Sequence, residues 1–127
     1  MLEITITIIS LSIMLLLALF HILLAFGAPL GEYAWGGFYP TLPRPFRIGS
    51  IFSALVLLFL SGVYAQNAGF ITITPSLPTN TILIIVTVFF ALNTFGNIAS
   101  KSRKERWGMT PISSVLFLLT LALVFIG

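Results

Sequence analysis

Four long apolar runs constrain the fold of this chain more than any other feature of its sequence. They cover residues 4–26, 46–65, 81–100 and 110–126. As an α-helix, the first run would be about 34 Å long, which exceeds the hydrocarbon thickness of a bilayer, about 30 Å. Only 7% of the chain is charged, whereas a soluble domain carries about a quarter charged residues. The sequence therefore predicts an all-α, polytopic membrane protein, in which a single transmembrane domain, residues 1–127, forms a four-transmembrane-helix up-down bundle.

Prolines and polar residues mark the connections between these helices. Pro29 ends the first helix, because proline lacks a backbone donor and disfavours helix just before it. Pro45 and Pro111 suit the first turns of the second and fourth helices. Loops are therefore expected at residues 27–45, 66–80 and 101–109. In the second loop, residues 70–74 alternate like a short strand. Three spanning helices with re-entrant segments are the alternative arrangement.

The basic residues indicate how the helices are oriented. All six Lys and Arg lie within residues 44–47 and 101–106, after the first and third helices. None precedes Arg44, so the first apolar run lacks the basic start of a signal peptide and is expected to span the membrane. The positive-inside rule then predicts that both termini lie outside and that the basic loops are cytoplasmic. The expected partners are the lipid bilayer and anionic lipid at the basic loops. This clustering argues against nucleic acid, despite a net charge of +3.

Polar residues inside the helices form a candidate pocket. Its residues are His21, Ser50, Ser53, Asn93 and Asn97, and their predicted depths all fall in the cytoplasmic leaflet, as do those of Ser113 and Ser114. Asn93 and Asn97 share one helix face, because they are four residues apart. These groups form either a polar pocket open to the cytoplasm or a set of interhelical hydrogen bonds, and the second use is favoured. A single His without neighbouring carboxylates or thiols cannot supply enough ligands for a metal, so no metal site is expected.

Residues 27–37 form an unusual segment, with four glycines in eleven residues. The segment contains Glu32, the only acidic residue between Glu3 and Glu105. Because Glu32 and the basic residues are predicted to lie on the same side of the membrane, an ion pair to Arg44, Arg47 or Arg106 would hold this loop against the helix ends. The candidate loop network is Glu32, Trp35, Arg44, Arg47, Glu105 and Arg106. A solvated, unpaired Glu32 is the alternative, since exposed ion pairs contribute little.

With these residues in view, the chain resembles a family of small, uncharacterised four-helix membrane proteins of bacteria. The resemblance rests on Gly27-Ala28-Pro29-Leu30-Gly31-Glu32-Tyr33-Ala34-Trp35-Gly36-Gly37 after the first helix and on Ser102-Arg103-Lys104-Glu105-Arg106-Trp107 before the fourth. The family pattern has a proline soon after that tryptophan, which Pro111 matches only with extra residues inserted. The resemblance implies a multi-pass protein of the bacterial cytoplasmic (inner) membrane, and it implies no known activity.

Composition narrows the possible functions. The chain has no Cys, no Asp and one His, so no catalytic residue is assigned and no cofactor is expected. The sequence favours a protein that acts by helix packing, as a homo-oligomer or as an accessory subunit of a membrane partner protein, because small residues in the second helix allow close approach. The alternative is a small-molecule or lipid binder or transporter with a cytoplasm-facing pocket around His21, Asn93 and Asn97. A membrane enzyme would have to use His21 with Glu32 or Glu105 as acid and base.

Overall fold

The computed structural model describes residues 1–126 and contains four long helices. Their bounds are α1 Leu2–Ala25, α2 Arg44–Asn67, α3 Thr79–Ile98 and α4 Arg103–Ile126. Two short 3-10 turns, η1 (Gly31–Tyr33) and η2 (Trp35–Gly37), lie between α1 and α2. Each of the four long helices has the length and apolar composition needed to cross a membrane. This confirms the all-α class and the prediction of four helices long and apolar enough to span a membrane.

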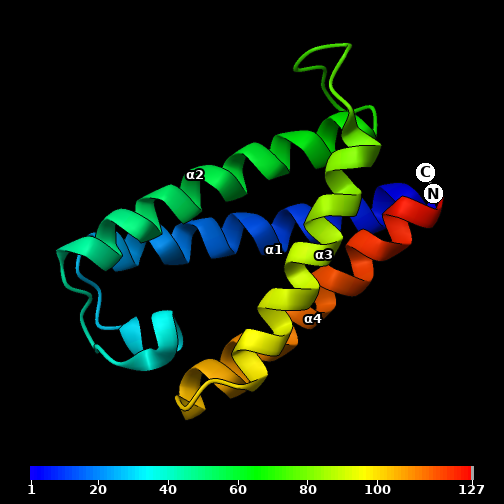
Figure 1. The fold of residues 1–127 in the computed structure, drawn as a ribbon. Helices are drawn as coiled ribbons and strands as arrows, with labels where there is room; N and C mark the ends of the chain where they lie inside the picture. The colour runs from blue at the N-terminus through cyan, green and yellow to red at the C-terminus, as the bar shows by residue number, and fades with distance from the viewer. Residues whose placement is uncertain (127) are drawn as a thin grey trace.

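The helices form two hairpins, in which α1 packs along α2 and α3 packs along α4 (Figure 1). Consecutive helices run in opposite directions, and both termini lie at the same end of the molecule (Figure 1). α2 and α3 approach each other near residues 68–78, which connect them, and diverge toward their other ends (Figure 1). The segment that carries η1 and η2 lies at this wide end, between the two hairpins, and contacts α4.

α1 and α2 both end at a glycine with a positive backbone φ. The φ angle is 96° at Gly27 and 82° at Gly69, a conformation that is costly for residues with a Cβ. After α1, the Ala28 N–H donates to the Leu23 carbonyl and the Gly27 N–H donates to the Leu24 carbonyl. These are the paired bonds of a Schellman motif, and the same pair closes α2. Glycine, and not only the proline that follows, therefore ends α1.

α4 begins at Arg103 and not near Thr110, so most of the expected third loop is helical. Ser102 caps this helix, because its Oγ accepts the Glu105 N–H at 3.3 Å, the Ser-x-x-Glu spacing of a capping box. Pro111 lies inside the helix. The prediction was wrong because the Thr-Pro pair was taken for the helix start although an earlier cap signal precedes it.

Residues 70–74 form an irregular turn and not a strand. Gln66, near the end of α2, holds this turn. Its side-chain oxygen accepts the Ile73 N–H, and its side-chain nitrogen donates to the Thr74 carbonyl, both at 2.7 Å. The alternating pattern was misleading because residues 1–126 contain no strand with which it could pair.

The half of the bundle nearest the termini is packed with apolar side chains. Met14 and Leu83 are completely buried there. Tyr64 is also completely buried, and its hydroxyl forms a hydrogen bond with Thr120 Oγ1 at 2.5 Å. This bond satisfies two polar groups that would be costly to leave unpaired in an apolar interior. The wide end of the bundle is built differently, because it encloses a cavity.

Candidate functional site

A cavity of about 430 Å³ lies at the wide end, among all four long helices. The loop between α1 and α2 covers it through Tyr33, Ala34 and Trp35. Most of its wall is apolar or aromatic. The polar residues that line it are His21, Ser53, Asn93, Asn97, Glu105 and Ser113. Four of the five predicted pocket residues therefore border one space, and the fifth, Ser50, contacts His21 directly.

His21 is connected to α2 through the hydroxyl of Ser50. The His21 Nδ1 atom lies 3.3 Å from Ser50 Oγ, and the Trp35 indole N–H donates to the same oxygen at 3.0 Å. Ser50 is completely buried, so one hydroxyl joins α1, α2 and the covering loop. The second imidazole nitrogen, Nε2, makes no hydrogen bond within residues 1–126.

Trp35 has a backbone conformation that bulky residues rarely adopt. Its φ is 54°, the one positive value at a non-glycine position within the described residues. The indole lies so close to α2 that a Cβ at Gly49 would be 2.9 Å from the ring, and the ring also contacts Phe46 at a centroid distance of 5.6 Å. Gly49 thus makes room for an aromatic side chain and not for another helix. These contacts and the bond to Ser50 hold a strained residue at the cavity wall.

Glu105 lines the cavity, and only 8% of its surface is exposed. Its Oε2 atom accepts the Gly36 N–H across a long 3.5 Å. Gly36 and Gly37 have φ values of 81° and 75°, and this left-handed run directs the Gly36 amide toward α4. Within residues 1–126, Glu105 takes part in no ion pair. The buried carboxylate therefore has one weak hydrogen bond and no cationic partner.

Asn97 and Asn93 lie on the same face of α3 but have different surroundings. Asn97 is buried, and its Nδ2 donates to Ser113 Oγ on α4 at 3.0 Å. Asn93, one turn earlier, is exposed at the rim of the cavity. Ser53 donates to the Gly49 carbonyl within its own helix. The polar layer therefore provides both interhelical hydrogen bonds and the lining of a cavity, the two uses that the sequence left open.

The most exposed large side chains of the cavity lining lie on α2 and α3, at the side of the bundle. Phe52 on α2 and Phe89 on α3 both line it and are 68% and 53% exposed, and the exposed Asn93 lies beside them. Both phenylalanines belong to helices that are long and apolar enough to span a membrane, and here the two helices diverge (Figure 1). Because the loop covers the basic end and these exposed side chains lie on α2 and α3, the arrangement favours a lateral opening over the cytoplasm-facing opening that the sequence analysis expected.

The predicted loop network forms only in part and with a different partner. Glu32 pairs with Lys104, whose Nζ lies 3.7 Å from Oε1. Within residues 1–126, Glu32 makes no ion pair with Arg44, Arg47 or Arg106. The expected loop 101–109 left the relative positions of Lys104 and Arg106 open, whereas α4 begins at Arg103 and brings Lys104 beside η1. Both charged side chains of the pair are about half exposed, so its contribution to stability is small.

Arg47 fastens the covering loop near its two ends, and Ser102 fastens it near its middle. The Arg47 Nε donates to the Leu42 carbonyl at 2.7 Å, and its guanidinium lies beside Gly27, where a cation suits the carbonyl end of α1. Ser102 Oγ donates to the Glu32 carbonyl at 2.6 Å while it accepts the Glu105 N–H. Sequence reasoning missed Ser102, although its Ser-x-x-Glu spacing was a usable signal.

The chemistry of the site follows from the groups that it brings together. His21 and Glu105 line the same cavity, whereas Glu32 does not. Within residues 1–126, no three His, Cys, Asp or Glu side chains are close enough to hold a metal ion. In comparisons with known proteins, no family model, curated protein or solved structure matches the chain. Its function is therefore argued from the geometry of the cavity.

Proposed function

We propose that this protein binds a small amphipathic molecule, drawn from the bilayer, in the cavity between its four helices. The observation that carries the proposal is the cavity, whose volume of about 430 Å³ falls in the range of about 300–1,000 Å³ typical of small-molecule sites. In a bundle that served only to pack helices, His21 and Asn97 would bond across closed interfaces. Here both residues also border an internal space.

The wall and the opening of the cavity support an amphipathic ligand. Apolar and aromatic side chains form most of the wall, and a few convergent polar groups would orient a bound molecule. The His21 Nε2 atom and the Glu105 carboxylate both have hydrogen-bonding capacity that residues 1–126 leave unused. The opening between Phe52 and Phe89 would admit the apolar part of the ligand directly from the lipid phase.

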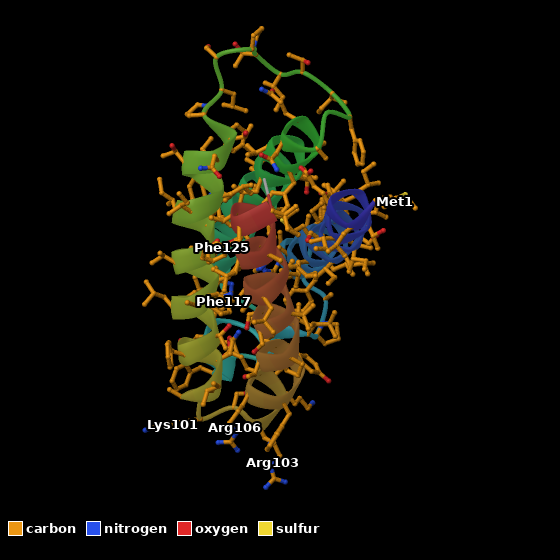
Figure 2. All side chains as sticks on the ribbon, turned by 90° about the vertical axis from the view of Figure 1, so that its right-hand side faces the viewer. Met1, Lys101, Arg103, Arg106, Phe117 and Phe125 are labelled. Carbon is orange, nitrogen blue, oxygen red and sulfur yellow. The ribbon has the colours of Figure 1, made fainter. Side chains whose placement is uncertain are left out.

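The proposed setting is the cytoplasmic membrane of a bacterium, with both termini outside and the wide end of the bundle at the cytoplasmic face. Figure 2 supports this orientation, because Lys101, Arg103 and Arg106 gather at the end opposite Met1, and positive charge is enriched on the cytoplasmic side. Trp107 at the same end is 70% exposed, as suits a residue at the membrane interface. Anionic lipid headgroups are the proposed partners of these basic residues.

A cavity-filling substitution tests the proposal. Ser53→Leu adds apolar volume inside the cavity, and Ser12→Leu makes the same change at an exposed position of α1. The two serines are matched, since each donates to the carbonyl four residues earlier, at 3.0 Å for Ser53 and 2.9 Å for Ser12. The probe is tert-butylbenzene, added to detergent-solubilised protein while thermal unfolding is followed.

The probe is expected to raise the unfolding temperature of the wild type and of Ser12→Leu, and to lose most of this effect in Ser53→Leu. A ligand that binds only the folded state stabilises it by about 2.7 kcal/mol at roughly 100 times its Kd. An equal temperature shift in both variants would mean that the probe binds elsewhere and would remove the support for a functional cavity.

A second candidate function is assembly with another membrane helix through α3. Asn93 presents an exposed amide on a helix of membrane-spanning composition, and a Cβ at Gly96, one turn on, would meet nothing within 4 Å. Polar and small residues on an exposed face are used for association between membrane helices. If the protein assembles in this way, as a homo-oligomer or an accessory subunit, Gly96→Leu should reduce the mass of the detergent-solubilised complex measured by light scattering. If the wild-type protein already has the mass of a monomer, self-association is excluded.

A further inference from the structure

We propose that the molecule bound in the cavity is an organic cation with an apolar body, and that Glu105 is its counter-ion. This inference rests on the proposed function, because it names the ligand class of the same cavity. The first observation is the charge of the cavity lining. Among its residues Glu105 is the only one with a carboxylate, and no Lys or Arg is among them.

The surroundings of the Glu105 carboxylate favour negative charge, but within residues 1–126 no cation pairs with it. It lies in the first turn of α4, where the helix dipole favours negative charge, and it accepts the Gly36 N–H. Its exposed fraction is only 8%, and a buried carboxylate is costly unless it is paired. A cation in the cavity would supply the missing partner.

The cations at the basic end of the bundle are engaged elsewhere or point away. Lys104 pairs with Glu32, and Arg47 donates to the Leu42 carbonyl. Arg103 and Arg106 point away from the bundle at its basic end (Figure 2). Among the described residues, no Lys or Arg therefore neutralises the Glu105 carboxylate from the cavity side.

The aromatic wall suits the same ligand. Six aromatic residues line the cavity, and the face of an aromatic ring attracts a cation most strongly where water is excluded. They are Phe20, Tyr33, Trp35, Phe52, Phe89 and Phe90. An alkylammonium or arylammonium group could thus contact Glu105 and an aromatic face at once, while its apolar body occupies the wall toward the opening between α2 and α3.

Three probes of similar shape and different charge test this inference. They are phenyltrimethylammonium, its neutral isostere tert-butylbenzene, and the anion benzenesulfonate, each titrated into detergent-solubilised full-length protein while thermal unfolding is followed. We expect the cation to bind the wild type about tenfold more tightly than the neutral isostere, as one cation–π contact and one ion pair in a partly dry site allow, and the anion to bind most weakly. Equal or tighter binding of the neutral isostere or of the anion overturns the inference.

Glu105→Gln identifies the counter-ion. This variant keeps the shape and an acceptor oxygen but removes the charge, so the preference for the cation should disappear while the affinity for tert-butylbenzene is retained. Glu32→Gln is the matched control, because Glu32 is an acidic residue of the same end that lies outside the cavity, and its preference should equal that of the wild type. A cation preference that survives in Glu105→Gln, or that Glu32→Gln removes, refutes the assignment.

Two further results separate the possible failures. If Glu105→Gln does not fold, Glu105→Asp keeps the charge and withdraws it by one methylene, and it must weaken cation binding severalfold; unchanged binding counts against the inference. Binding of tert-butylbenzene that is sensitive to Ser53→Leu, without any preference for the cation, rejects the ligand class and leaves the proposed function standing. The absence of binding by all three probes rejects both.

Discussion

Gly37→Ala tests how the loop between α1 and α2 is fastened to α4. Gly37 has a φ of 75°, and a Cβ built on it would collide with the side chain of Ser102 and lie 2.9 Å from the Glu32 carbonyl oxygen. Ser102 caps α4 and donates to that same carbonyl. The added methyl group must therefore displace the side chain that both caps α4 and bonds to the loop.

The expected loss of stability can be worked out against a matched control. Gly69→Ala meets the same backbone strain, since φ is 82° at Gly69, but its Cβ would meet nothing within 4 Å. Strain of about 1–2 kcal/mol, less about 0.4–1 kcal/mol from the stiffer unfolded chain, leaves roughly 1 kcal/mol for Gly69→Ala. Gly37→Ala also loses the cap on α4, about 1 kcal/mol, and the bond from Ser102 to Glu32, about 1 kcal/mol. Its total is roughly 3 kcal/mol.

The assay is reversible unfolding in mixed micelles of increasing denaturing-detergent fraction, followed by circular dichroism. Ser102→Gly supplies a rescue test, because it removes the Cβ and hydroxyl that collide with the new methyl group. The double variant should be more stable than the sum of the two single losses predicts, as expected for residues in contact. If Gly37→Ala and Gly69→Ala differ by less than about 0.5 kcal/mol, the limit of additivity between independent sites, the loop is not fastened through Ser102.

Three further predictions concern single contacts, and each is read from the same unfolding assay. Tyr64→Phe should destabilise the protein by about 1 kcal/mol, the usual value of a hydrogen bond between membrane helices. Adding Thr120→Val to that variant should lower its stability little further, because the two residues share one hydrogen bond. Arg47→Met should cost about 1–2 kcal/mol, because the Leu42 carbonyl and the end of α1 lose a charged donor. Glu32→Gln should change stability by less than about 1 kcal/mol, and the change should shrink as salt is added, because an exposed ion pair is screened. A larger effect that persists at high salt would show that this pair is stronger than its exposure implies.

The helices themselves could be predicted because their signals are local. A run of apolar residues long enough to cross a bilayer must satisfy its backbone within the segment, and a helix does so. The helix ends were less certain. Gly27 and Pro29 together mark the end of α1, but at α4 two start signals competed, and the cap at Ser102 prevailed over the proline at position 111. The alternation at 70–74 failed for a non-local reason, since a strand requires a partner that this fold does not provide.

The candidate site divides in the same way between local and tertiary information. His21, Ser53, Asn93 and Asn97 stood out in the sequence because polar residues are rare in apolar helices. The sequence placed Glu105 in the candidate loop network, and only the structure shows that it lines the cavity. Its position depends on the divergence of two hairpins and on a loop that turns through positive φ at Trp35, Gly36 and Gly37.

The sequence by itself thus determined the spans, the polar layer and the charged end, because each depends on composition or on spacing along one helix. Only the tertiary structure decided that the polar layer surrounds a space of about 430 Å³ and that a buried carboxylate faces it. The physical reason is that a cavity belongs to no single segment. It arises where α2 and α3 separate, and it persists because Ser50, Ser102 and the strained Trp35 hold the loop over it.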